Sequence, residues 1–205
     1  PDPALIAAAL ADGVRREGVA ALPWGEAASS LRERARFLHA RDAAVWPDLS
    51  DAALLARLDD WLTPLLAGMR TLAALKPDAL DAALRTLIPW DLQRRLEAEA
   101  PARWTAPTGN AFAIDYAAEA GPRVDVRVQE VYGLSAHPTV AGVPLTLSLL
   151  SPAHRPIQTT KDLPGFWKGS WKEVRTEMRG RYPRHLWPED PAAAQPTTRA
   201  KPRGT

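Results

Sequence analysis

The residues of this chain best suited to binding chemistry gather in one tract, residues 162–191, where tryptophans, prolines and basic residues are dense. Aromatic rings can stack on unpaired bases, because every base offers a π face. Guanidinium and ammonium groups can contact phosphate oxygens. The candidate nucleic-acid contacts are therefore basic and aromatic side chains of this tract: Lys168, Lys172, Arg175, Arg179, Arg181, Arg184, Trp167 and Tyr182.

Helical spacing gives part of this tract two neighbouring faces. At about 100° per residue, Trp171 and Met178 share one side of a helix. Lys172, Arg175 and Arg179 fall within about 60° of each other beside that side. This strip could follow a nucleic-acid backbone. Alternatively, the tryptophans pack the helix against a sheet, and the cations face solvent or pair with carboxylates.

No catalytic constellation is found in the sequence. There is no cysteine, no Walker phosphate loop, no Gly-x-Gly-x-x-Gly and no Gly-x-Ser-x-Gly. The histidines lack the spacing of zinc ligands; they are His39, His137, His154 and His185. We therefore expect no catalytic residue, no metal site and no cofactor site in this chain.

Charge is distributed unevenly along the chain. Residues 161–205 carry ten lysines or arginines and five acidic residues, while the rest carries 16 basic and 19 acidic residues. A basic end on a near-neutral body is a footprint for phosphates, and it is also typical of a solubilising tail. A second basic cluster is predicted to be a solvated helix face and a second candidate phosphate contact; it comprises Arg32, Arg34, Arg36 and Arg41.

The first hundred residues show helical periodicity. Asp2 and Pro3 form a helix start and Gly18 a helix stop. Predicted helices cover residues 3–17, 26–41, 51–63, 77–87 and 90–99. The tryptophans of this part are predicted to pack: Trp24, Trp46, Trp61 and Trp90.

After Pro101 the pattern changes to the period of two that is typical of strands. Apolar residues alternate with other residues over 112–116, 124–128 and 145–149, and Gly-containing turns separate these runs. The break from Val128 to Val131 indicates a bulge. Ser170 and Glu173 have capping-box spacing, which predicts a helix from Trp171 to about Arg179.

These patterns predict an α+β fold class. An N-terminal helical module is followed by a mostly antiparallel sheet with a C-terminal helix, and the residues beyond Pro191 form a disordered tail. No apolar run approaches the roughly 18 residues of a membrane span. The chain starts without methionine and without a basic leader, so we expect a cytoplasmic fragment of a longer protein.

Several segments, in order along nearly the whole chain, resemble the C-terminal region of HrpB-type bacterial ATP-dependent RNA helicases of the DEAH class. They are Leu22-Pro23-Trp24, Trp46-Pro47-Asp48-Leu49-Ser50, Leu87-Ile88-Pro89-Trp90, Gln129-Glu130-Val131-Tyr132-Gly133-Leu134, Leu149-Leu150-Ser151-Pro152, Gly180-Arg181-Tyr182-Pro183 and His185-Leu186-Trp187-Pro188-Glu189-Asp190-Pro191. Several matches in the correct order are more specific than a single short motif.

This resemblance implies a helical connector over residues 1–70, a C-terminal α+β domain over 71–191 and a disordered tail over 192–205. In complete proteins of this kind, two RecA-like motor domains lie upstream and bind ATP and Mg²⁺. No catalytic residue carries over, because none of the family's motor motifs has a counterpart here.

The resulting hypothesis is an accessory C-terminal region of an RNA helicase. It would dock on the upstream helicase domains and extend or gate the RNA path, with single-stranded RNA as a second partner. The alternative is a protein-interaction module with no nucleic-acid role, in which the tract rich in proline and tryptophan is a docking surface.

Overall fold

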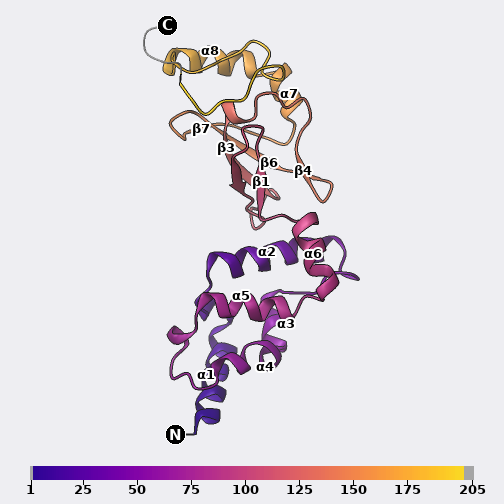
Figure 1. Cartoon of the computed structure of the whole chain (residues 1–205), viewed down its shortest axis with the longest axis vertical. Coiled ribbons are helices and arrows are strands. Elements are labelled where there is room, and N and C mark those ends of the chain that lie inside the picture. The colour runs from indigo at the N-terminus through magenta and orange to yellow at the C-terminus, as the bar shows by residue number, and fades with distance from the viewer. Residues whose placement is uncertain (1, 201–205) are drawn as a thin grey trace. The chain divides into compact units, whose positions relative to one another are not determined.

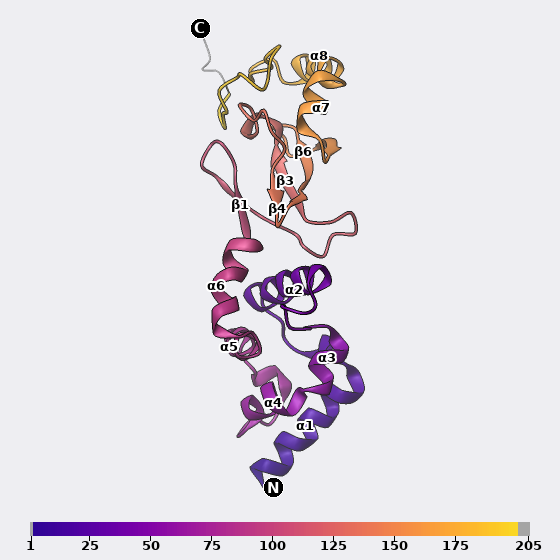
Figure 2. The ribbon, with the colours of Figure 1, turned by 90° about the vertical axis from the view of Figure 1, so that its right-hand side faces the viewer.

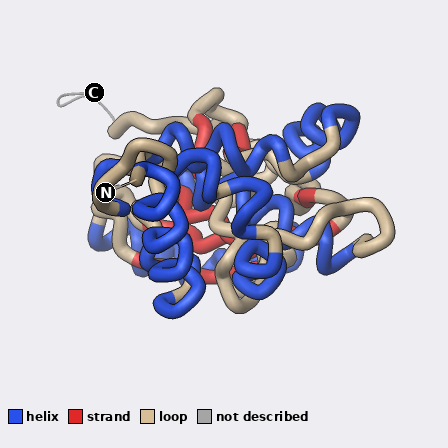
Figure 3. The backbone as a smooth tube through the Cα atoms, turned by 90° about the horizontal axis from the view of Figure 1, so that it is seen from below, coloured by secondary structure: helices blue, strands red, loops and turns tan. Residues whose placement is uncertain are grey.

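The computed structural model describes residues 2–200, which form two compact units. The first unit ends at Ala102 and the second begins at Arg103, close to the change of sequence pattern after Pro101. Figure 1 shows helices in the first unit and a mixture of helices and strands in the second. All strands of the described residues (red in Figure 3) belong to the second unit, which confirms the predicted α+β class.

The first unit is built from helices and short 3₁₀ segments. Its α-helices are α1 (Pro3–Glu17), α2 (Glu26–Arg41), α3 (Asp51–Ala56), α4 (Leu58–Trp61), α5 (Pro77–Thr86) and α6 (Trp90–Glu99). Its 3₁₀ segments are η1 (Val19–Ala21), η2 (Thr63–Leu66) and η3 (Leu72–Ala74). The predicted third helix is divided into α3, α4 and η2, because Arg57 leaves the helical region at ψ 21° and Pro64 cannot continue an α-helix.

Helix ends in this unit follow the sequence signals. The Asp2 carboxylate accepts a hydrogen bond of 2.9 Å from the Ala4 amide at the start of α1. Gly18 ends α1 at φ +87°, a backbone conformation that favours glycine. Ser50 caps α3 through a 3.2 Å bond from the Ala53 amide to its hydroxyl.

Leucines and three tryptophans fill the core of the first unit. Leu31 of α2, together with Leu80 and Leu84 of α5, is almost completely buried between these two helices. The indole of Trp61 donates to the Leu54 carbonyl at 3.0 Å and stacks on Trp24 with ring centroids 6.4 Å apart. Trp46 and Trp61 are buried and Trp24 is half-buried against Trp61, so packing is confirmed for these three tryptophans.

Two arginines of the predicted solvated cluster are not solvated, so the prediction was wrong for both. The side chain of Arg32 is 14% exposed, donates to the Leu49 carbonyl at 2.9 Å and pairs with Asp51, while Arg34 is buried. Only 3% of Arg34 is exposed. Its Nε donates to the Ala100 carbonyl at the end of α6, and its Nη2 pairs with Glu97 at 2.6 Å. The last carbonyls of a helix lack partners within the helix, so a cation that reaches them is stabilised there.

The second unit contains short strands followed by two helices. Its elements are β1 (Arg103–Thr105), β2 (Ala111–Ala113), β3 (Arg123–Arg127), η4 (Val128–Glu130), β4 (Thr139–Val140), β5 (Val143–Pro144), β6 (Thr146–Leu150), β7 (Pro156–Thr160), α7 (Leu163–Lys168) and α8 (Trp171–Arg181). The pairs β1–β2, β4–β5 and β6–β7 are antiparallel, which agrees with the predicted mostly antiparallel sheet.

The central pair, β3 and β6, is parallel, and Figure 2 shows the two strands side by side. The sheet order is β3-β6-β7. Val124 and Val126 of β3 lie opposite Leu147 and Leu149 of β6, and all four are buried. Residues 128–145 return the chain to the start of β6, as a parallel pair requires a long connection.

The break expected as a bulge is instead the 3₁₀ segment η4, which buries Gln129 and Glu130. The sequence prediction also missed α7. Its start is capped by the Asp162 carboxylate, which accepts from the Gly165 amide at 2.9 Å. A Cβ at Gly165 would lie 2.1 Å from that carboxylate, so this close approach requires glycine.

The last helix begins at the predicted residue by a different mechanism. Ser170 has φ −74° and ψ −5° and makes no side-chain capping bond, so the predicted capping box does not form. The helix passes through Gly180 and ends at Arg181, two residues later than predicted. Glycine in a helix interior is unfavourable by about 1 kcal/mol, and packing of α8 outweighs that preference.

Residues 192–200, for which we expected disorder, follow a defined path. The Gly133 amide donates to the Pro191 carbonyl at 2.9 Å, and the Thr197 amide donates to the Gln129 carbonyl at 3.0 Å. Residues 201–205 of the predicted tail lie outside the described residues. The domain bounds 1–70, 71–191 and 192–205 stay a prediction, since they concern a family domain rather than the compact units.

Candidate nucleic-acid interface

A buried aromatic cluster lies beneath the basic tract. Its members are Tyr132, Phe166, Trp167, Trp171 and Trp187, each less than 10% exposed. Trp171 is at the centre, with ring centroids 5.3 Å from Trp167, 5.9 Å from Tyr132 and 6.2 Å from Trp187. These separations lie in the range where aromatic pairs attract beyond simple area burial.

The polar edges of the cluster hold the segment that follows α8, residues 182–191, which we call the C-terminal strap. The Trp171 indole donates to the Pro188 carbonyl at 3.0 Å, and the Tyr132 hydroxyl donates to the Leu186 carbonyl at 3.1 Å. The Trp187 indole donates to the Tyr182 carbonyl at 2.9 Å. Burial raises the pKa of Tyr132, so its hydroxyl stays protonated and remains a donor.

Arg175 also holds the strap, which changes the predicted basic strip. Its Nε donates to the Trp187 carbonyl at 2.9 Å, and its guanidinium pairs with Glu189 at 3.1 Å. The sequence placed Arg175 between Lys172 and Arg179 as a phosphate contact. In the structure its hydrogen-bonding groups face the strap, and the two flanking cations remain on the surface.

Three candidate contacts lie exposed on α7 and α8. Lys168, Lys172 and Arg179 form no hydrogen bond or ion pair through their side chains within residues 2–200. Arg181 is exposed as well and pairs with Glu177 at 2.9 Å. This surface therefore presents cations that a ligand can reach without breaking an internal contact.

The remaining candidates are less accessible or lie on the strap. Trp167 is 8% exposed and donates to the Leu134 carbonyl at 3.0 Å, so its ring is part of the core. Tyr182 is half-buried, with its hydroxyl 3.3 Å from the Ser151 hydroxyl. Arg184 is exposed on the strap. Nucleic-acid contact by any of these residues stays a prediction.

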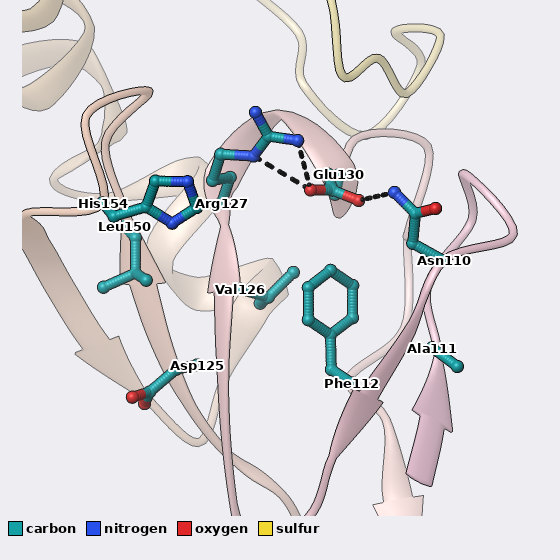
Figure 4. Close-up of a pocket in the computed structure, with 9 residues that line it drawn as sticks. All are labelled: Asn110, Ala111, Phe112, Asp125, Val126, Arg127, Glu130, Leu150 and His154. Carbon is teal, nitrogen blue, oxygen red and sulfur yellow. Dashed lines mark hydrogen bonds and ion pairs between the residues drawn. The ribbon is translucent and has the colours of Figure 1, made fainter.

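A second site, which the sequence reasoning missed, surrounds a buried carboxylate on η4 (Figure 4). Glu130 is 1% exposed and accepts hydrogen bonds from Thr108 at 2.9 Å and Asn110 at 2.7 Å. Arg127 donates two bonds to it, of 3.0 and 2.8 Å. The only sequence signal was Glu130 itself within Gln129–Leu134, one of the family-like segments.

This carboxylate borders a pocket of about 370 Å³. Beside Glu130 the lining residues are Asn110, Ala111, Phe112, Asp125, Val126, Arg127, Leu150 and His154. Burial by itself raises the pKa of Glu130, but the bonds from Asn110, Arg127 and Thr108 outweigh burial, and the pKa lies below its ordinary value. The pocket wall therefore holds a permanent ion pair at neutral pH.

In the first unit, Trp90 contradicts the prediction of packing. It is 81% exposed at the start of α6. A groove of about 550 Å³ lies beside it, lined by Arg85, Asp91, Gln93, Arg94 and Glu97. The Pro89-Trp90 pair begins a helix as expected, but the sequence does not reveal that the ring faces outward.

The part of the chain that the structure describes has neither a membrane-spanning helix nor a cluster of metal ligands. Between residues 2 and 200, no helix has the length and apolar character needed to cross a bilayer. Over the same residues, no group of three or more His, Cys, Asp or Glu side chains could hold a metal ion.

Comparison with known proteins places these features in a family. The profile of the family described as ATP-dependent helicase C-terminal, HrpB_C, matches residues 61–191. The chain belongs to this family. The match includes the aromatic cluster, the Glu130 pocket, Trp90 and the whole C-terminal strap. The earlier resemblance to the C-terminal region of HrpB-type helicases is thereby confirmed.

Members with known sequences and structures agree. The chain is 46% identical over 199 residues to the ATP-dependent RNA helicase HrpB of Escherichia coli K12, covering 94% of this chain and 24% of that protein. It matches crystal structures of the E. coli DExH-box NTPase HrpB (TM-score 0.86, 44% identity, 97% of this chain and 25% of that one) and the E. coli DEAH/RHA helicase HrpB (0.73, 41%, 91% and 24%). The chain thus spans about a quarter of these relatives.

Replacing Glu130 with glutamine should remove a pH-dependent part of the stability. Because its pKa is lowered in the folded protein, the carboxylate stabilises the fold above its ordinary pKa of 4.5, and this contribution is lost as pH falls through the lower folded-state pKa. We expect Glu130→Gln to lower the free energy of unfolding by about 1–3 kcal/mol at neutral pH. Urea unfolding along a pH series measures this difference.

The difference between wild type and Glu130→Gln should shrink as the solution is acidified below pH 4.5. Glu177→Gln is the matched control, since Glu177 is 54% exposed in its pair with Arg181 and should change stability little at any pH. A Glu130→Gln effect that is constant across the acid range would contradict a role for the ionised carboxylate.

Proposed function

We propose that this chain is the accessory C-terminal part of an ATP-dependent RNA helicase, that it contacts single-stranded RNA, and that it docks on the helicase domains of the same protein. The observation that carries the RNA part is the set of unengaged cations Lys168, Lys172 and Arg179 on α7 and α8. Family membership supports the helicase setting, since the E. coli relative is an RNA helicase by name.

The physical basis of the RNA contact is electrostatic. Cations that neutralise phosphates release bound counterions, which favours binding at low salt. Lys172 and Arg179 are seven residues apart, so they lie on one side of α8, two turns from each other. Arg175, which lies between them, donates to the strap and so fixes α8 against it, while Lys172 and Arg179 remain available to a ligand.

ATP turnover is assigned to other parts of the protein under this proposal. The sequence of this chain has no Walker phosphate loop. ATP and Mg²⁺ would bind in the upstream motor domains, and the site of action would be the cytoplasm. This chain would then influence where RNA runs as it leaves or enters the motor.

The triple substitution Lys168→Gln, Lys172→Gln and Arg179→Gln should weaken binding of single-stranded RNA about tenfold at low salt. Each lost phosphate contact lowers the salt slope by about 0.7, so the slope should fall by about 2. Fluorescence anisotropy of a labelled RNA over a salt series measures both quantities.

The matched control replaces three exposed cations of the first unit, as Arg16→Gln, Arg70→Gln and Lys76→Gln. This variant has the same net charge as the test variant and should bind RNA like the wild type. If both triple variants lose the same affinity, the effect is one of total charge and the α7–α8 surface has no special role. Absence of RNA binding by the wild type would refute the RNA contact altogether.

A second candidate function, a protein-interaction module, is favoured by the exposure of Trp90. The neighbouring groove is lined by two arginines, Arg85 and Arg94, and two carboxylates, Asp91 and Glu97, and Arg85 already pairs with Asp81 at 2.9 Å. Such a groove suits a protein surface better than a polyanion. Tryptophan and arginine are also the residue types enriched where binding energy concentrates in protein interfaces.

Trp90→Ala should reduce binding of this chain to the remaining helicase domains by more than about tenfold, without loss of stability, because the ring has few internal contacts. A pull-down with those domains, treated with RNase, measures the binding. Leu5→Ala is the control, since Leu5 is also exposed, at 68%, and lies far along the sequence. Equal capture by Trp90→Ala and wild type would exclude Trp90 from the interface.

A further inference from the structure

Strand β3 has one edge that is only partly paired. Toward β6 its backbone is bonded in the parallel register, beginning with the Thr146 amide on the Pro122 carbonyl at 2.7 Å. On the opposite edge, Arg123 exchanges two bonds of 2.9 Å with Asp115. The backbone groups of Asp125 and Arg127 face this same edge, because direction alternates with period two. No strand of residues 2–200 pairs with the backbone groups of Asp125 or with the Arg127 amide on this edge, whereas the Arg127 carbonyl begins the 3₁₀ segment η4.

The strand beside this edge is anchored at both ends. One end is fixed by the Asp115–Arg123 bridge. At the other end, Glu130 accepts from Thr108 and Asn110, which connect β1 to β2. Between these points β2 runs beside β3 without a ladder of hydrogen bonds, and residues of both strands line the 370 Å³ pocket. The Arg127–Glu130 ion pair and the Asp115–Arg123 bridge therefore fix the position of β2 beside β3.

The pocket joins an apolar surface to a polar rim. Figure 4 shows the Phe112 ring beside Val126, below the Arg127–Glu130 pair, with the His154 imidazole on the other side of Arg127. His154 has φ +57°, a conformation that is unfavourable for a residue with a side chain and is found disproportionately at functional sites.

The C-terminal strap also reaches the turn beside this rim. Burial, then the charges of Arg127 and Arg184, lowers the pKa of His185, which favours the neutral imidazole. The Tyr182 hydroxyl, 3.3 Å from the Ser151 hydroxyl, joins the strap to the turn that carries His154. Tyr182 of the strap is thus joined to the turn that carries His154, a residue of the pocket wall.

We propose that this pocket binds one unpaired nucleotide of single-stranded RNA. The edge of the base would hydrogen-bond to the backbone amide and carbonyl of Asp125 and to the Arg127 amide, and its face would lie on Phe112. The phosphate would contact Arg127 and His154. This assignment rests on the proposed RNA contact and adds a base-binding subsite to it.

A nucleobase fits these observations better than a peptide strand does. An added strand needs a continuous open edge, whereas this edge is closed by the bridge at one end and by the Glu130 contacts at the other. The pocket volume of about 370 Å³ lies at the lower end of the roughly 300–1,000 Å³ typical of small-ligand pockets. A flat ring with adjacent donors and acceptors matches backbone groups on a single strand, and stacking on an aromatic ring is tolerant of base identity.

The test is an NMR titration of the ¹⁵N-labelled chain with adenosine 5′-monophosphate, with ribose 5-phosphate as the probe that lacks a base. We expect the backbone amide signals of Asp125 and Arg127 to shift with the nucleotide and not with the sugar phosphate. Phe112→Leu should weaken the nucleotide about tenfold, while Phe112→Tyr, which keeps an aromatic ring, should retain it.

Each other outcome overturns the subsite. Shifts confined to α7 and α8 would remove the pocket but leave the proposed RNA contact intact. Shifts of Asp125 and Arg127 with a short extended peptide and not with the nucleotide would assign the edge to a polypeptide. Equal shifts with both sugar-containing probes would show a phosphate site without base recognition.

Discussion

The second unit depends on hydrogen bonds from buried aromatic rings to the carbonyls of the C-terminal strap. Trp171 and Tyr132 are almost completely buried, and each has one polar group that must find a partner. The strap provides those partners at Pro188 and Leu186, while Arg175 satisfies a third carbonyl at Trp187. A buried donor without its partner costs about 1–3 kcal/mol, so the rings and the strap stabilise each other.

This constraint also determines which side chains remain for binding. With Arg175 committed to the strap, Lys172 and Arg179 are left on the outer surface of α8. The strap in turn carries Tyr182 to the turn beside the Glu130 pocket. The buried carboxylate plays the corresponding role on the sheet, because it fixes the loop between β1 and β2 and keeps the Arg127 guanidinium in place. The contacts that stabilise the second unit therefore also determine which side chains are left exposed for binding.

Periodicity predicted the helices of the first unit and the buried valines of β3, since these depend on residues close in sequence. The parallel pairing of β3 with β6 could not be read in this way, because it depends on the path of the connection. The role of Arg175 was missed for a similar reason: its partners are 12 and 14 residues away. Trp90 shows the opposite case, in which an apolar residue at a helix start lacks any covering element within its own unit.

The most direct test of this account is the exchange of indole N–H protons with solvent, followed by NMR. Trp171 donates from the centre of the buried cluster, whereas Trp90 is 81% exposed and serves as an internal reference in the same sample. We expect the Trp171 proton to exchange only through large-scale opening, and the Trp90 proton to exchange as in a free indole. Equally fast exchange at both positions would mean that the strap leaves the cluster in solution, which would contradict the account.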